Sequence, residues 1–400
     1  MGICSTCHKE CKTFDIMFED GTLIGFCSDC LEEMRESICA DEVVDAKGKG
    51  VKVKSDDFEI PTPADIKKIL DDYVIGQEEA KKTIAVGIYN HYKRIISGKT
   101  NIQKSNIIMV GPTGVGKTEL ARTCAKIVNV PFCICDATTV TEAGYVGDDV
   151  ENMLLRLLQA ADMDIEAAER GIIYIDEIDK IARKGEGTSI TRDVSGEGVQ
   201  QALLKIIEGA EVDVAITGGR KHPLGDRVRI DTSNILFICG GAFEGLTMSK
   251  EKKKNLGFAT DKIDDNDDSE IEVTPKVLEK QGLIPELVGR LPITVKLNKL
   301  TRENLKDILT NTKNSIINQY KDLIELDEVK FKVNELAIDF IANKAFENET
   351  GARGLKTIIE KTMNDAMFEI PSDKSISSVE LTVENDKLFV KKNYKKKKSA

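Results

Sequence analysis

The chain has 400 residues, of which 41% are hydrophobic and 31% charged, and its formal net charge is -11 at pH 7. This length and composition predict two or three domains with hydrophobic cores, and no run approaches the ~20 apolar residues of a membrane-spanning helix. The acidic balance argues against a nucleic-acid footprint over the whole surface, without excluding a local one. We therefore expect neither nucleic acid nor a membrane as a partner.

Two C-x₂-C pairs open the chain, with nineteen residues between them. This spacing is typical of four-cysteine zinc sites, and a segment of about forty residues has too small a core to fold without such a staple. We predict a zinc-binding domain at 1–40 that holds a structural Zn²⁺ with no open coordination position. The predicted zinc ligands are Cys4, Cys7, Cys27 and Cys30. The spare ligands nearby, any of which can replace one of the four, are His8, Cys11 and Cys39.

Cysteine usage also bears on the compartment. Six of the ten cysteines lie in the first 39 residues, while Cys133, Cys135 and Cys239 fall in apolar strands, where we expect small buried core residues. This distribution favours a reducing compartment. Because a motif beginning at Cys4 leaves no room for a signal peptide, we expect a cytoplasmic location.

A charged, glycine-bearing stretch follows and predicts a flexible linker at 41–60. A helical pattern then runs over 64–70, and residues 73–77 lead into a second helix that continues through Tyr92.

The apolar strand 107–110 leads into a sequence that fits G-x-x-x-x-G-K-[ST] in full. Its residues are Gly111, Pro112, Thr113, Gly114, Val115, Gly116, Lys117 and Thr118. In such a loop the backbone N–H groups surround phosphates, the lysine meets the β/γ charge and the hydroxyl ligates Mg²⁺. The chain is therefore predicted to bind ATP with Mg²⁺.

A second apolar strand, 172–175, ends in Asp176 and Glu177. Asp176 is suited to hold Mg²⁺, and Glu177 is placed to polarise a water for attack on the γ-phosphate. Hydrolysis, not binding alone, is the expectation.

Strands and helices alternate through about residue 298, which predicts an α/β domain with a mostly parallel sheet at 61–298. Within it, the acidic segment 261–272 is expected to be a mobile surface loop. The pattern then becomes helical, over 303–320, 333–347 and 352–368, followed by a short strand at 378–383. We predict a small, mainly helical domain at 299–388 and a solvated, disordered basic tail at 389–400.

These motifs together resemble the AAA+ ATPases, and within them the subunits that unfold proteins for a separate peptidase. The segments that carry the resemblance, besides the phosphate loop, the Asp-Glu pair and the zinc domain, are 73–77, 144–147, 196–201, 219–223, 282–290 and 351–355. The resemblance covers nearly the whole chain. It implies a homohexamer that pulls tagged proteins, delivered directly or by adaptors, through a central pore.

The resemblance also implies roles for single residues. Arg290 would be the arginine finger that reaches a neighbour's γ-phosphate, and Arg353 would contact nucleotide within its own subunit. Val74 and Ile75 would line the adenine pocket, as core residues or in addition to a core role. The residues that would contact substrate in the pore are Tyr145, Val146, Arg220, Lys221 and His222. The segment 192–198 resembles a second pore loop, and a simple turn is the alternative. The residues that would dock the peptidase are Leu256, Gly257 and Phe258.

Two departures from the family pattern stand out. The acidic stretch after Phe258 does not map onto the family pattern, and the strand ending at Cys239 and Gly240 lacks the polar sensor residue that many AAA+ proteins place there. We therefore assign no such sensor.

Two other classes of protein share parts of this pattern. A nucleic-acid remodelling ATPase is compatible with the ATP-binding core, but the aromatic pore motif and negative charge disfavour it. A non-hydrolysing, zinc-bearing adaptor is disfavoured by Glu177 and Arg290. An intrinsic protease site is not expected, since the three histidines His8, His91 and His222 are not flanked by a recognisable nucleophile motif.

Overall fold

The computed structural model describes residues 60–99, 101–141, 149–182, 196–216, 227–243 and 273–395, and the backbone of four short strands within the first 27 residues. The chain divides into two units, Met1–Glu59 and Ile60–Ala400.

The first unit contains, in its described backbone, two antiparallel strand pairs. β1 (Gly2–Ile3) pairs with β2 (Glu10–Cys11), and β3 (Thr13–Met17) pairs with β4 (Leu23–Cys27). The second pair is a hairpin that places Cys27 opposite Thr13.

The second unit is built, in its described part, around a five-stranded parallel sheet in the order β11-β5-β10-β7-β6. These strands are β5 (Ile107–Val110), β6 (Phe132–Asp136), β7 (Ile172–Asp176), β10 (Leu236–Gly241) and β11 (Ile293–Lys296). The predicted strands at 107–110 and 172–175 are confirmed as β5 and β7. Because β5, β10 and β7 are adjacent and parallel, their carboxyl ends meet at one edge of the sheet.

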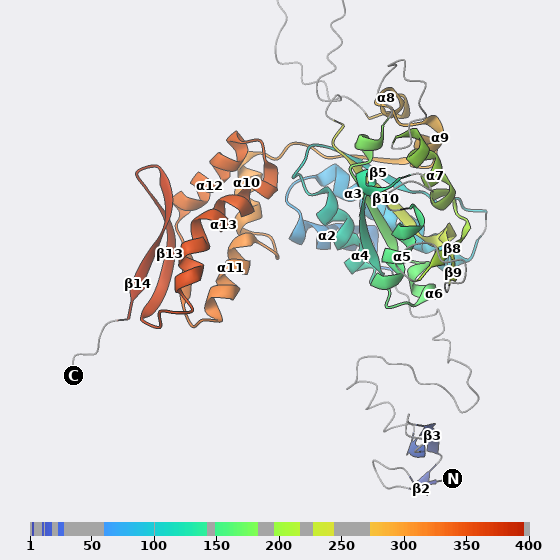
Figure 1. Ribbon diagram of the computed structural model, residues 1–400, viewed down its shortest axis with the longest axis horizontal. Helices are drawn as coiled ribbons and strands as arrows, with labels where there is room; N and C mark the ends of the chain where they lie inside the picture. Colours follow the sequence, from blue (N-terminus) through green and yellow to red (C-terminus); the bar gives the residue numbers. More distant parts are fainter. Residues whose placement is uncertain are drawn as a thin grey trace, which may run out of the picture. The chain divides into compact units, whose positions relative to one another are not determined.

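Helices cover both faces of this sheet (Figure 1). On one face, Ile108, Ile173 and Phe237 pack in one cluster with residues of α5, α7 and α9. Alternate strand residues point to the opposite face, where α3 and α4 contact the sheet. The helices of this domain are α2 (Pro63–Tyr73), α3 (Glu78–Ser97), α4 (Lys117–Ile127), α5 (Glu151–Ala160), α6 (Ile165–Ala168), α7 (Glu197–Glu208), α8 (Pro275–Lys280) and α9 (Pro285–Gly289). An antiparallel pair, β8 (Glu211–Ala215) and β9 (Arg227–Asp231), forms a separate sheet.

Local capping explains several helix limits. Thr62 accepts a hydrogen bond from the Asp65 N–H, and Pro63 occupies the first turn of α2. Helix α3 ends at Gly98 in the left-handed conformation. Both helices are longer than the sequence analysis proposed, because α2 continues to Tyr73 and α3 to Ser97.

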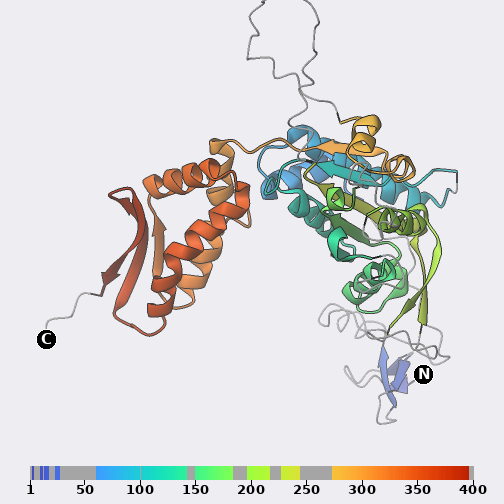
Figure 2. The same cartoon turned by 45° about the horizontal axis from the view of Figure 1, so that its top comes forward.

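The carboxyl-terminal part combines four helices with a three-stranded sheet in the described residues. Its elements are α10 (Arg302–Thr310), α11 (Ile316–Glu325), β12 (Lys330–Val333), α12 (Glu335–Glu347), α13 (Gly351–Glu369), β13 (Ile376–Glu384) and β14 (Lys387–Tyr394). In both views, β13 and β14 form a long twisted ribbon beside the helices (Figures 1 and 2).

Two predictions in this part are wrong. The single helix proposed at 303–320 is two helices, because Ser315 caps a new helix by accepting the Asn318 N–H at 3.2 Å. The disordered basic tail proposed from residue 389 is also incorrect through Tyr394. Residues Lys387–Tyr394 form β14, and its apolar residues Leu388 and Val390 pair with residues of β13.

The predicted core cysteines are confirmed. Cys133, Cys135 and Cys239 are buried, and like Cys124 they are thiols outside any described disulfide. Burial raises the pKa of Cys239 to about 12, so this thiol stays protonated and unreactive. Among the helices described, none is both long and apolar enough to cross a membrane.

Candidate active site

The glycine-rich loop follows β5 at the carboxyl edge of the sheet and opens α4 at Lys117. Gly114 has φ +74°, and a Cβ built there would lie 2.7 Å from the Thr350 carbonyl oxygen. A larger residue at 114 would therefore strain the backbone and collide with the turn that precedes α13. The Ala352 N–H donates to the Gly114 carbonyl at 3.0 Å, so the backbone of the loop touches the backbone at the start of α13.

Lys117 lies almost completely inside this loop, with 8% of its surface exposed. Its Nζ donates to the carbonyl oxygens of Gly111 at 2.6 Å and Pro112 at 2.8 Å. Burial lowers the pKa of Lys117, and the nearby Asp176 and Asp179 carboxylates oppose that shift. The ammonium group is thus held at the mouth of the loop, where an anionic ligand can replace the carbonyl partners.

Asp176 ends β7 and is bound by three donors from different elements. Its Oδ1 accepts from the Glu177 N–H at 3.0 Å and from the Tyr174 hydroxyl at 3.2 Å, while its Oδ2 accepts from the Thr118 hydroxyl at 3.3 Å. Hydroxyl and carboxylate oxygens are the ligands that Mg²⁺ prefers. The pair formed by Thr118 and Asp176 therefore fits a magnesium ion.

Glu177 follows Asp176 with a left-handed φ of 57° and an exposed side chain. A non-glycine residue in this region is uncommon and marks a strained position of the kind found at active sites. The turn places the Glu177 carboxylate in the lining of the same cavity as Lys117 and Thr118.

That cavity has a volume of about 360 Å³, within the usual range for small-molecule sites. Its lining comes from the phosphate loop, the end of β7, the residue after β10 and the first turn of α13. The residues are Thr113, Gly114, Gly116, Lys117, Thr118, Glu119, Asp176, Glu177, Asp179, Lys180, Ala242, Ala352 and Arg353. Arg353 is therefore part of the lining of the same cavity, and its contact with nucleotide stays a prediction.

Other predicted residues lie apart from this cavity. Val74 is buried with a methyl group 3.5 Å from a Cβ built on Gly116, and Ile75 is half-buried, but neither is part of the cavity lining. Arg290 is exposed, and its Nε donates to Glu208 at 2.6 Å. Its carbonyl accepts from Asn106, which precedes β5, so Arg290 lies at the end of the sheet opposite the phosphate loop.

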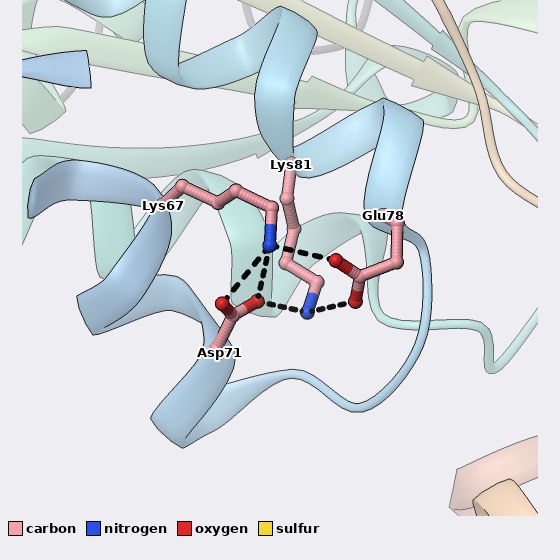
Figure 3. A network of polar contacts seen from close by, with 4 residues as sticks. All are labelled: Lys67, Asp71, Glu78 and Lys81. Carbon is pink, nitrogen blue, oxygen red and sulfur yellow. Dashed lines mark hydrogen bonds and ion pairs between the residues drawn. The ribbon is translucent and has the colours of Figure 1, made fainter. Parts of the chain in front are cut away.

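The segment that carries Val74 and Ile75 is held by charges on the two helices that flank it. Lys81 of α3 bonds Asp71 of α2 at 2.5 Å and Glu78 at 3.1 Å, and Lys67 bonds both acids at 3.0 and 2.6 Å (Figure 3). Lys81 is only 2% exposed. Burial opposes the ionisation of Asp71, but hydrogen bonds from Lys81 and Lys67 outweigh it and lower the Asp71 pKa.

Gln77 ends the same segment and bonds the residue that lies two positions after β11. Its Nε2 donates to the Asn298 carbonyl and its Oε1 accepts the Asn298 N–H, each at 2.8 Å. Gln77 has a left-handed φ of 61°. This paired amide fixes the chain at the point where the α/β domain ends.

Several predicted sites lie outside the described residues, and they stay predictions. These are the pore residues Tyr145, Val146, Arg220, Lys221 and His222, the docking residues Leu256, Gly257 and Phe258, and the side chains of Cys4, Cys7, Cys27 and Cys30.

Two residues of the site, and one contact outside it, were missed by sequence reasoning. Tyr174 bonds Asp176, Gln77 bonds Asn298, and Asp179 accepts the Ala242 N–H at 3.1 Å, which fixes the chain after β10. Asp179 carries a local signal, as a third acid one turn beyond Asp176. Tyr174 also carries a signal in the sequence, because it places a hydroxyl group in an otherwise apolar strand.

The sheet order, the glycine-rich loop at the end of β5 and the acids Asp176 and Glu177 at the end of β7 define an ATPase of the AAA+ class. A family model for the AAA domain of the Cdc48 subfamily matches residues 102–294, and one for the C-terminal, D2-small domain of ClpB protein matches 300–384.

Curated relatives narrow the class further. The ATP-dependent Clp protease ATP-binding subunit ClpX of Treponema denticola is 51% identical over 383 residues, 93% of this chain and 91% of the relative. The protein of the same name from Bacteroides thetaiotaomicron is 49% identical over 358 residues, 87% of this chain and 86% of the relative. The chain belongs to the ClpX family of ATP-dependent protein unfoldases. It is an ATPase, and the predicted AAA+ fold is confirmed.

Proposed function

We propose that the chain hydrolyses ATP with Lys117 on the phosphates, Thr118 and Asp176 as magnesium ligands and Glu177 as the general base. The observation that carries this assignment is the single cavity lined by all four residues. The magnesium ion, when bound, neutralises phosphate charge. Glu177 is placed to take a proton from the attacking water, because its carboxylate is exposed beside the phosphate loop.

Hydrolysis would require a second copy of the chain. Arg290 lies at the opposite end of β5 from its own phosphate loop, and a four-residue strand separates the two by about 13 Å. A finger at this position would act on a neighbour's nucleotide, which supports an assembly of several copies; the family resemblance implies that this assembly is a homohexameric ring. Arg353 would report the nucleotide to the small domain, because it lies in the first turn of α13 and lines the cavity.

The work performed would be the unfolding of tagged proteins by Tyr145 and Val146 in the pore, with Arg220, Lys221 and His222 at its entrance. The curated relatives are named as subunits of a Clp protease. We propose that this chain likewise delivers substrate to a ClpP-type peptidase through Leu256, Gly257 and Phe258, in the cytoplasm.

The first unit would bind a structural zinc ion and capture substrates or adaptors. The β3–β4 hairpin supports this proposal, because it returns Cys27 to a position opposite Thr13, close in sequence to the first cysteine pair. Four thiolates would complete the tetrahedron.

The test follows the fluorescence of a tagged, stably folded fluorescent protein mixed with the chain, ATP and a ClpP-type peptidase that traps unfolded product. We expect the signal to fall with the native chain and to stay constant with Glu177→Gln, which retains ATP binding. A constant signal with continuing ATP hydrolysis would overturn the unfoldase assignment. Stimulation of that hydrolysis by DNA would then favour a nucleic-acid remodelling role.

A further inference from the structure

The strand that carries the magnesium-binding acid also carries a buried tyrosine whose hydroxyl reaches that acid. Tyr174 is fully buried, and its hydroxyl donates to Asp176 Oδ1 at 3.2 Å. The two residues are separated by one position in β7, so their side chains lie on the same face of the sheet.

The two oxygens of Asp176 have different partners. Oδ1 receives the Tyr174 hydroxyl and the Glu177 N–H, whereas Oδ2 faces only the Thr118 hydroxyl among the hydrogen bonds described. Oδ1 is therefore anchored by the protein, and Oδ2 is presented beside the other magnesium-binding group. Without the tyrosine, Oδ1 would keep one donor, and the carboxylate could rotate about its χ2 torsion.

The neighbouring strand leaves room for this hydroxyl. Tyr174 pairs with Ile238 in β10, and a Cβ built on Gly240 would lie 2.1 Å from the Tyr174 hydroxyl oxygen. Any side chain at 240 would displace the hydroxyl. The end of β10 thus has no polar side chain of its own, and the Tyr174 hydroxyl of β7 lies against this part of the strand.

We propose that Tyr174 is a positioning residue that orients Asp176 for magnesium binding. This inference rests on the proposed magnesium role of Thr118 and Asp176. Hydrogen-bonding partners of metal ligands commonly contribute 10- to 100-fold to metal affinity. Since Asp176 would retain the Glu177 N–H, we expect the lower end of that range.

The test compares Tyr174→Phe with the native full-length chain. Mn²⁺ affinity in the presence of ADP is measured by electron paramagnetic resonance, and ADP affinity is measured separately in EDTA. We expect Tyr174→Phe to weaken Mn²⁺ binding about tenfold and to leave ADP binding in EDTA unchanged. In ATPase assays, the half-saturating Mg²⁺ concentration should rise by a similar factor, with kcat recovered at saturating Mg²⁺.

The matched control is Tyr92→Phe. Tyr92 is another buried tyrosine, whose hydroxyl bonds the Arg170 carbonyl at 3.0 Å, away from the cavity lining. This variant loses one buried hydroxyl and should keep native Mn²⁺ affinity. Equal Mn²⁺ affinity of Tyr174→Phe and the native chain would overturn the proposal, as would an equal loss of ADP binding in EDTA.

Asp176→Asn separates this proposal from the one on which it rests. We expect it to abolish the gain in ADP affinity that Mg²⁺ provides. If Asp176→Asn bound Mn²⁺ as tightly as the native chain, the magnesium assignment of Asp176 itself would fail, whatever Tyr174→Phe did.

Discussion

The charge network of Figure 3 makes an asymmetric prediction about stability. Lys81 is 2% exposed, whereas its partners Asp71 and Glu78 are 40% and 63% exposed. Lys81→Met removes the buried charge and leaves two solvated acids that still pair with Lys67. Because exposed ion pairs contribute little, this change should cost at most about 1 kcal/mol.

The reverse change should be much more costly. Asp71→Ala combined with Glu78→Ala leaves the Lys81 ammonium buried without its two carboxylates. An uncompensated buried charge costs about 3 to 5 kcal/mol, and we take the lower limit because the long lysine stem can move its head group toward solvent. The expected difference between the two variants is thus about 2 kcal/mol.

Urea unfolding followed by the helical circular dichroism signal measures this difference, since the chain has no tryptophan. At a slope of about 3 kcal/mol per molar urea, the double variant should lower the midpoint by about 1 M and Lys81→Met by a third of that or less. Lys67→Met, which alters the more exposed lysine, is the matched control. If Lys81→Met destabilised the chain as much as the double variant, the reasoning from burial would be refuted.

The same network predicts how stability depends on acid. Hydrogen bonds donated by the lysines lower the pKa of Glu78 and, against the effect of burial, that of Asp71, from ordinary values of 4.5 and 3.8. Their contribution is complete above those ordinary values and is lost as the pH falls through the lower values of the folded state. Further predictions concern other parts of the molecule. Burial lowers the pKa of His91 to about 3 from 6.5, so stability should fall below pH 6.5 by up to ~1.4 kcal/mol per pH unit. His91→Gln should reduce that slope in urea midpoints measured from pH 7 to 5, and an unchanged slope would contradict it. Gly114→Ala should weaken ADP binding, because its Cβ would lie 2.7 Å from a carbonyl oxygen; native affinity in a fluorescent-ADP titration would count against this. Arg290→Ala should keep ADP binding while lowering kcat by roughly 10³-fold or more, and its activity should recover in mixed rings with Glu177→Gln subunits if the finger acts on a neighbour.

The sequence predicts the parts of this site that depend on local signals. The glycine-rich loop and the strand ending in Asp176 and Glu177 are contiguous motifs, and both lie in the cavity as expected. The sheet also follows from sequence, because buried parallel strands appear as uninterrupted apolar runs.

The parts that could not be predicted depend on distant contacts or on competition between local signals. Gln77 bonds a residue 221 positions away, which no local pattern reveals. The break before α11 depends on Ser315 capping a helix instead of continuing one. In β14, the lysine run suggested a solvated tail, but pairing with β13 satisfies the backbone and outweighs that composition.

The two hydrogen bonds between the Gln77 side chain and the Asn298 backbone limit where the small domain can rotate relative to the α/β domain. Asn298 is held on both backbone groups, and Leu297 before it continues the β11 ladder through the Val110 carbonyl. The next fixed point is Thr301, which is the N-cap residue of α10. Only Lys299 and Leu300 lie between these two fixed points, a span of about 7 Å at full extension. A connection this short limits how far the small domain can shift, so its movements would be mainly rotations that are largest at its far end.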